Sequence, residues 1–238
     1  MPGVGVLMIL LFISSIPAIA VFIWFRLASY PFSLLRYSFS LLAGAVSFFP
    51  ALVFQSILNN AGGDIFYAMG KWGLFAEIFV RIAFTEEFSR LIILIILLVA
   101  IRRFGSGEQT EQALGHSQDL AISGKSSESA VGLVAGFGFA ILESAVYGAS
   151  NPGNALLRTF TTAPLHGACG FRVGSSVMMF RDRPVQAIFR FLSAVAIHGV
   201  YNFLLVIPGA VPSIVAILIA LSALAASIVA IRNGMQEE

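Results

Sequence analysis

Seven apolar runs, each about as long as a bilayer is thick, constrain the fold of this chain. They cover residues 4–25, 37–58, 73–101, 130–148, 155–180, 185–206 and 211–231. A helix of about 20 apolar residues crosses the hydrocarbon core of a membrane. Charged residues make up only 11% of the chain, less than half of the roughly 25% found in soluble domains. The sequence therefore predicts an all-α, polytopic bundle of seven transmembrane helices.

We expect a single transmembrane domain over residues 1–238, because most connections between the runs are short. The exception is a polar segment at about 102–129, whose Ser, Gly, Gln and Glu content predicts a mobile cytoplasmic loop. No Lys or Arg precedes the first run and Arg26 follows it, the reverse of a signal peptide, so this run is expected to be a permanent span. A formal net charge of +2 indicates no nucleic-acid partner.

The basic residues between the runs predict the orientation in the membrane. If the runs alternate in direction, nine of these residues fall on one side and two on the other. The larger set is Arg26, Arg36, Arg102, Arg103, Lys125, Arg181, Arg183, Arg190 and Arg232, and the smaller set is Lys71 and Arg158. Because Lys and Arg concentrate in cytoplasmic loops, we expect the N-terminus outside and the C-terminus in the cytoplasm.

Three charged residues, Glu86, Glu87 and Arg90, interrupt the middle of the third run. A charge near the bilayer centre costs roughly 2.5–3.5 kcal/mol on insertion scales, so such residues usually face a protein interior and carry function. Glu86 and Arg90 are four residues apart, share a helix face and can partly compensate each other's charge. Glu87 points about 100° away from Glu86. We therefore expect one glutamate to reach the centre and the other to bond to an adjacent helix.

Three further runs carry polar side chains that a lipid-facing surface would reject. These are Glu143 in the fourth run, His166 in the fifth, and His198 with Asn202 in the sixth. At 1.5 Å per residue, the four positions 86, 143, 166 and 198 lie about 20–22 Å from the cytoplasmic ends of their runs. Side chains at one depth can meet, so the pattern predicts a shared polar cavity among runs three to six.

Small residues on two of these runs favour close packing of the helices. Gly132, Gly136 and Ala140 form a stripe ahead of Glu143, and Gly170 and Gly174 continue the face of His166. Such stripes let two helix backbones approach closely in a membrane. Close approach would bring the side chains of one helix within reach of the next.

Carboxylate, imidazole and amide groups placed together away from bulk water favour hydrolysis. A glutamate, Glu86 or Glu87, would take a proton from water, with Glu143 assisting, and the resulting hydroxide would attack a carbonyl. His166 and His198 would transfer protons or stabilise the oxyanion, and Asn202 would position the carbonyl. We expect no obligatory cofactor. The alternative is a zinc ion, for which ligands are available at Glu86, Glu143, His166 and His198.

Four short motifs, in order between residues 85 and 203, resemble those of the PrsW intramembrane proteases. Residues 86–90 resemble the family's Glu-Glu-x-x-Lys, with Arg90 in place of the lysine, and residues 139–143 match Phe-x-x-x-Glu. His166 is followed eight positions later by Gly174, and residues 198–202 match His-x-x-x-Asn. The chain is also similar to the wider group of CAAX prenyl endopeptidases and Abi-type proteins.

The resemblance implies an intramembrane endopeptidase that cleaves membrane-embedded or membrane-associated peptides, with Glu86, Glu87, Arg90, Glu143, His166, His198 and Asn202 as its site residues. It also implies an integral protein of a prokaryotic inner membrane. The rival interpretation is a non-catalytic scaffold that binds a partner's transmembrane helix, because the chain is also similar to the seven-span scaffold subunit of gamma-secretase. A proton-coupled transporter is a third interpretation, although the sequence lacks the internal repeat of many transporters.

Overall fold

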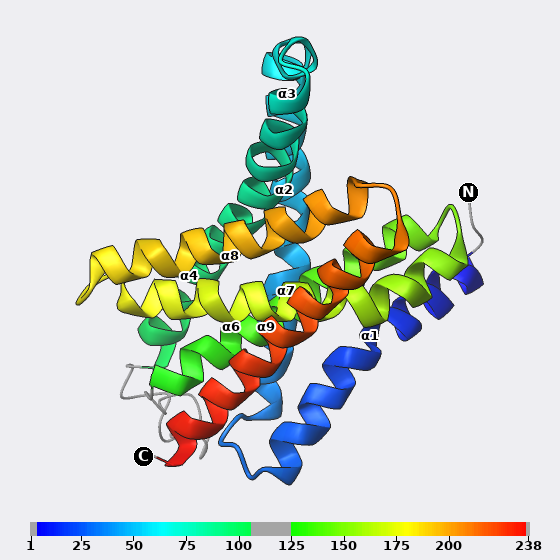
Figure 1. Cartoon of the computed structure of the whole chain (residues 1–238). Helices are drawn as coiled ribbons and strands as arrows, with labels where there is room; N and C mark the ends of the chain where they lie inside the picture. The colour runs from blue at the N-terminus through cyan, green and yellow to red at the C-terminus, as the bar shows by residue number, and fades with distance from the viewer. Residues whose placement is uncertain (1–3, 106–124, 237–238) are drawn as a thin grey trace.

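The computed structural model describes residues 4–105 and 125–236, and these residues form helices without any strand. The elements are α1 (Val4–Leu27), α2 (Leu34–Ala68), α3 (Lys71–Ala76), the π-helix η1 (Glu77–Phe84), α4 (Thr85–Gly105), α6 (Lys125–Gly148), α7 (Pro152–Met179), α8 (Pro184–Val206) and α9 (Ala210–Gln236). Figure 1 shows the end of α2 and the α3 segment projecting together beyond the other helices. The predicted all-α fold is confirmed.

Each of the seven predicted runs lies on helix, and the third is formed by α3, η1 and α4 in succession. Five helices are long and apolar enough to cross a membrane: Val4–Leu27, Leu34–Gly62, Glu128–Gly148, Pro184–Val206 and Ala210–Gly234. The other two long helices, α4 and α7, carry several of the polar groups described below. The predicted loop at 102–129 was too long at both ends, because α4 continues to Gly105 and α6 begins at Lys125. Its remainder, 106–124, lies outside the described residues.

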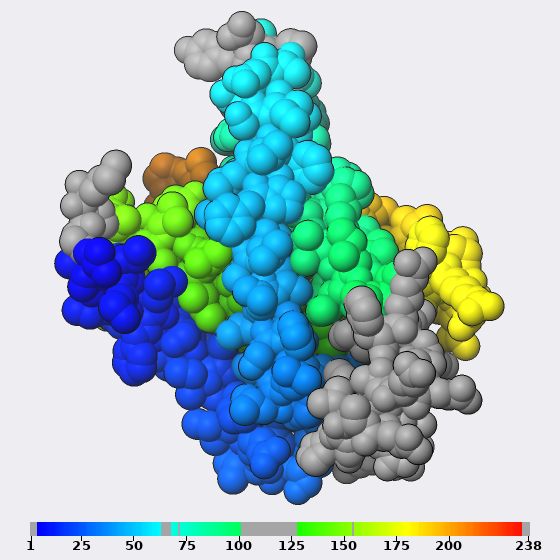
Figure 2. All heavy atoms as spheres, turned by 180° about the vertical axis from the view of Figure 1, so that it is seen from behind, coloured from blue at the N-terminus to red at the C-terminus, as the bar shows by residue number. Residues whose placement is uncertain are grey.

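Helix α6 is the centre of the bundle. Of its most apolar window, 83% is buried within the protein, against 22–33% for the other four candidate spans. Every residue from 130 to 140 is buried. Seen from behind, α2 runs from one end of the molecule to the other, with α1 on one side of it and α4 on the other (Figure 2). A helix that is apolar all round belongs in such a protein interior, and α6 thereby serves as the support for its neighbours.

Glycines bring α6 and α7 into direct backbone contact. A Cβ atom added at Gly136 would overlap the carbonyl oxygen of His166, and one added at Gly170 would overlap that of Gly132. Gly174 likewise faces the backbone of Gly132. The two predicted small-residue stripes therefore lie against each other, as expected for close membrane-helix packing. This contact fixes the backbone of His166 against α6.

The π-helix η1 connects α3, at the start of the third run, to the charged segment at the start of α4. Its Arg81 pairs with Glu77, and the hydroxyl of Thr85 donates to the carbonyl of Arg81 over 2.6 Å. π-Helical turns are rare and occur frequently at functional sites. A Cβ atom added at Gly199 of α8 would overlap the ring of Phe79 in η1, so η1 packs closely on α8, one residue from His198.

Replacing Gly136 with alanine is expected to destabilise the protein by about 1–3 kcal/mol, the usual cost of overpacking. The added methyl group has only helix backbone to displace, and backbone cannot rotate away as a side chain can. Thermal unfolding of the purified protein in detergent would measure the loss.

The matched control is Gly5→Ala, because a Cβ atom at Gly5 meets nothing within 4 Å. Alanine is the better helix former, so this variant should unfold at the wild-type temperature or slightly above it. Equal unfolding temperatures for the two variants would show that the α6–α7 contact is not close.

Candidate active site

Four helices bring ionisable side chains together in one buried cluster. Its members are Glu86, Glu87 and Arg90 from α4, Glu143 from α6, His166 from α7 and His198 from α8. Each of the six is at most 8% exposed, and Glu87, Arg90 and His166 are fully buried. The structure brings these side chains into contact, as the bonds below show.

Both carboxylate oxygens of Glu87 are occupied. Oε1 accepts from Nδ1 of His198 over 2.8 Å, and Oε2 forms an ion pair with Nη1 of Arg90. Arg90 forms its ion pair with Glu87, three residues away, and not with Glu86, four residues away, for which the sequence predicted partial compensation of charge. Both spacings place side chains on one helix face, and the carboxylate of Glu86 is bound by other helices.

Glu86 keeps one carboxylate oxygen without a hydrogen bond. Its Oε1 accepts from Nε2 of Gln55 in α2 over 3.0 Å. Its Oε2 lies 3.6 Å from Nε2 of His198 and has no hydrogen-bond partner within the described part of the chain. Both glutamates therefore reach the cluster, whereas the sequence predicted only one. A buried carboxylate oxygen without a donor is costly and commonly marks a site for water or an ion.

His166 bridges two charged groups. Its Nδ1 lies 3.2 Å from Nη2 of Arg90, and its Nε2 lies 2.7 Å from Oε2 of Glu143. A guanidinium can only donate hydrogen bonds, so Nδ1 must accept and the proton of a neutral ring must sit on Nε2. The same oxygen of Glu143 also receives Nη2 of Arg158 over 2.6 Å.

The two histidine rings and Glu86 form a group that could hold a metal ion. The ring centroids of His166 and His198 are 5.1 Å apart and the rings meet edge to face. One ligand atom from each of Glu86, His166 and His198 lies within 4.8 Å of the others. Two imidazoles and a carboxylate are a ligand set of catalytic zinc sites. Glu143, which the sequence added to this set, instead bonds to His166 and Arg158.

Two side chains of this network were not predicted. Gln55 is a polar residue in the otherwise apolar run of α2, and that contrast was the available signal. Arg158 was used only to predict the orientation of the chain, yet it lies two hydrogen bonds from His166, through Glu143. Asn202, one turn after His198, is half-buried and forms no side-chain hydrogen bond with other described residues. Its predicted contact with a substrate carbonyl stays a prediction.

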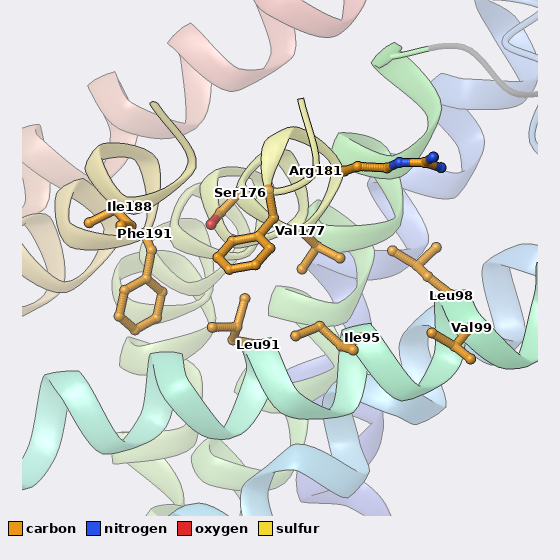
Figure 3. A pocket seen from close by; sticks show the side chains of 10 residues that line it. Leu91, Ile95, Leu98, Val99, Ser176, Val177, Arg181, Ile188 and Phe191 are labelled. Carbon is orange, nitrogen blue, oxygen red and sulfur yellow. The ribbon is translucent and has the colours of Figure 1, made fainter. Parts of the chain in front are cut away.

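An apolar groove lies between α4, α7 and α8, the helices that carry five of the six clustered residues. The cavity has a volume of about 500 Å³. Leu91, Ile95 and Val99 of α4 form one wall, and Val177 of α7 with Ile188 and Phe191 of α8 form the other (Figure 3). Such a groove suits a hydrophobic ligand in contact with these helices.

The family described as PrsW family intramembrane metalloprotease has a model that matches residues 31–230. No curated protein and no solved structure matches the chain. The matched region holds all six clustered side chains, three of the five apolar candidate spans in full and most of a fourth. The chain is therefore an integral membrane protein that belongs to the PrsW family of intramembrane proteases.

Proposed function

We propose that this chain is an intramembrane endopeptidase in which Glu86 activates the attacking water. The observation that carries the proposal is Oε2 of Glu86, a buried carboxylate oxygen without a hydrogen-bond donor, facing Nε2 of His198 at 3.6 Å. Water that donates to this oxygen would lie beside an imidazole. Glu86 would take a proton from the water, and the resulting hydroxide would attack the carbonyl carbon of the peptide bond.

Glu87 and Arg90 act as positioning residues in this proposal. Glu87 accepts from Nδ1 of His198 and so directs Nε2 of that ring towards Glu86. Arg90 neutralises Glu87 and donates to His166. With both of its oxygens occupied, Glu87 has no free position for water, which favours Glu86 as the base.

His166, His198 and Glu143 complete the proposed proton path. His198 would stabilise the oxyanion or carry a proton at Nε2. His166 holds a proton at Nε2 in its bond to Glu143, and together these two groups would deliver a proton to the leaving amine. Asn202, one turn from His198, would hold the substrate carbonyl.

The family description implies a metal, and the residues present fit one. The oxygen of Glu86 without a donor faces Nε2 of His198, and Glu87 orients that ring from behind, as carboxylates commonly do behind metal-binding histidines. As an alternative to the role of Glu86 as a general base, Glu86, His166 and His198 would hold a zinc ion, which when bound supplies Lewis acidity to the substrate carbonyl. His166 would have to release the proton that it shares with Glu143.

We also propose the topology and extent of the enzyme. Residues 1–238 would form one domain of seven spans, with the N-terminus outside and the C-terminus in the cytoplasm of a prokaryotic inner membrane. The support is the nine-to-two division of basic residues together with helices on all seven runs. The substrate would be the transmembrane segment of another protein, received by the apolar groove between α4 and α8.

Replacing Glu86 with glutamine is expected to lower the rate of peptide cleavage by about 10²- to 10⁴-fold, the usual contribution of a general base. The variant keeps the shape of the side chain, so its unfolding temperature should stay near that of the wild type. Cleavage of a purified single-span substrate in detergent, with thermal unfolding measured in parallel, gives both values.

The matched control is Glu77→Gln. Glu77 lies in η1, directly before α4, and forms an ion pair with Arg81. This variant should retain cleavage. If Glu86→Gln cleaves like the wild type, Glu86 is not the base. If it is inactive only because it is unfolded, the scaffold interpretation gains support.

Zinc analysis of the purified protein tests the metal site separately from activity. We expect about one zinc ion per chain in the wild type, and a clear loss of zinc in His198→Ala, because one of three ligands is removed. Elemental analysis by mass spectrometry after dialysis measures this. A wild type without zinc, and with full cleavage in the presence of a chelator, would leave Glu86 as a base that acts without metal.

Narrowing the apolar groove should weaken the binding of a transmembrane substrate. Ile95→Trp places a larger side chain in the groove, and we expect it to raise KM about tenfold or more with a smaller change in kcat. Ile96→Trp is the matched control, since Ile96 is 58% exposed and does not line the groove. Equal KM values for the two variants would contradict this route of substrate entry.

A further inference from the structure

A second cavity, of about 380 Å³, lies among α6, α7, α8 and α9, apart from the apolar groove. Its lining includes the hydroxyl groups of Tyr147, Thr162, Tyr201 and Ser213, the apolar side chain of Ile217 and the guanidinium group of Arg158. It differs from the first groove in its number of hydroxyl groups, because the lining of the groove has only Ser176 and Arg181 as polar residues.

Arg158 has hydrogen-bonding capacity that its surroundings leave unused. Its Nη2 bonds to Oε2 of Glu143 over 2.6 Å, and its guanidinium carbon lies 4.3 Å from the centre of the Tyr147 ring. Its Nε is buried and has no partner among the described residues. A guanidinium has five N–H donors in a planar fork that matches a carboxylate. The side chain is 20% exposed, so a ligand in the cavity can approach it.

The wall of this cavity continues into the active site. Oε2 of Glu143 accepts from both Arg158 and His166, so the cavity's guanidinium group is two hydrogen bonds from the histidine ring. Thr162 lies one turn before His166, and its hydroxyl lies 3.2 Å from that of Tyr201, three residues after His198. A group bound at Arg158 would therefore be beside the peptide that is being cleaved.

We propose that this cavity is a binding site for a carboxylate of the peptide, held by Arg158 and the surrounding hydroxyl groups. The proposal rests on the proposed protease function and names the chemistry that its substrate or product presents. The carboxylate has two sources: an acidic side chain next to the cleaved bond, or the new C-terminus that hydrolysis creates. Both would bind the guanidinium through charge-assisted hydrogen bonds.

Four peptide probes distinguish the two sources. The acetylated tetrapeptide Leu-Ala-Ala-Leu, with a free C-terminus or as its amide, tests the new terminus. The amides of Leu-Glu-Ala-Leu and Leu-Gln-Ala-Leu test the acidic side chain. Binding is measured on the full chain in detergent, for the wild type and for Glu86→Gln. The inactive Glu86→Gln variant reports binding without cleavage, so a failure of this site is distinguishable from a failure of the protease function.

We expect one carboxylate probe to bind about tenfold more tightly than its matched amide, the size of effect of one charge-assisted hydrogen bond. Arg158→Gln should abolish the preference. Ile217 lines the cavity and forms no described bond with Arg158 or Glu143. Ile217→Trp therefore fills the cavity without replacing either residue, and it should abolish the preference as well. Leu218→Trp is the control on the same helix, since Leu218 is 56% exposed and does not line the cavity.

Equal binding of carboxylate and amide in both probe pairs would overturn the proposal. A preference that persists in Ile217→Trp would do so too, because the carboxylate would then bind elsewhere. Competition by vesicles of phosphatidic acid, with no preference among the peptides, would assign the cavity to a lipid phosphate and equally reject a peptide site.

Discussion

The buried guanidinium group of Arg90 is the interaction on which the other contacts of the site depend. An unpaired charge in an apolar interior is strongly unfavourable, and this one is compensated by the ion pair with Glu87, the bond to His166 and the ring of Phe139, whose centre lies 4.7 Å away. Arg90 stands where the family motif has lysine. The planar fork of arginine lets one side chain contact a carboxylate and an imidazole through different nitrogens. Arg90 thereby determines which nitrogen of His166 carries the proton.

That arrangement requires α4, α6 and α7 to lie close together, and small residues make this possible. Glycines on α6 and α7 allow the two backbones to touch, so Glu143 and His166 approach to hydrogen-bonding distance. On the opposite side, Gly199 allows α8 to pack on Phe79 of η1. This contact brings His198 to the glutamates of α4. Packing of the backbones and pairing of the charges therefore depend on each other.

The helices, their approximate ends and the residues of the cluster were predictable from the sequence. Runs of apolar residues fix which segments are helical, and counting along each run fixes depth. Rotation about each helix axis was not predictable, and the errors follow from it. Depth alone cannot tell whether Arg90 meets Glu86 or Glu87, and a π-helix directly before these residues alters the rotation that an ideal α-helix would give.

Gln55 and Arg158 were missed for a related reason. Neither residue lies within one of the four sequence motifs, and the role of each depends on a partner that is distant in the chain. Gln55 meets Glu86 across 31 positions, and Arg158 meets Glu143 across a turn between two helices. Only the arrangement of the helices identifies such partners. The expected number of seven spans shows the same limit. Five of the described helices qualify as membrane spans by length and composition, whereas α4 and α7 carry polar groups that form bonds inside the protein.

The glycine contact between α6 and α7 also limits which helices of the bundle can move relative to each other. Two helix backbones in contact cannot slide or turn past each other without collision. We therefore expect α6 and α7 to move as one rigid unit that carries Glu143 and His166. Any widening of the groove between α4 and α8 then has to come from the outer helices. Under the proposed mechanism, each opening would separate Glu86 and His198 from this pair of helices and each closure would bring them back, so that substrate entry and assembly of the proposed catalytic groups would alternate.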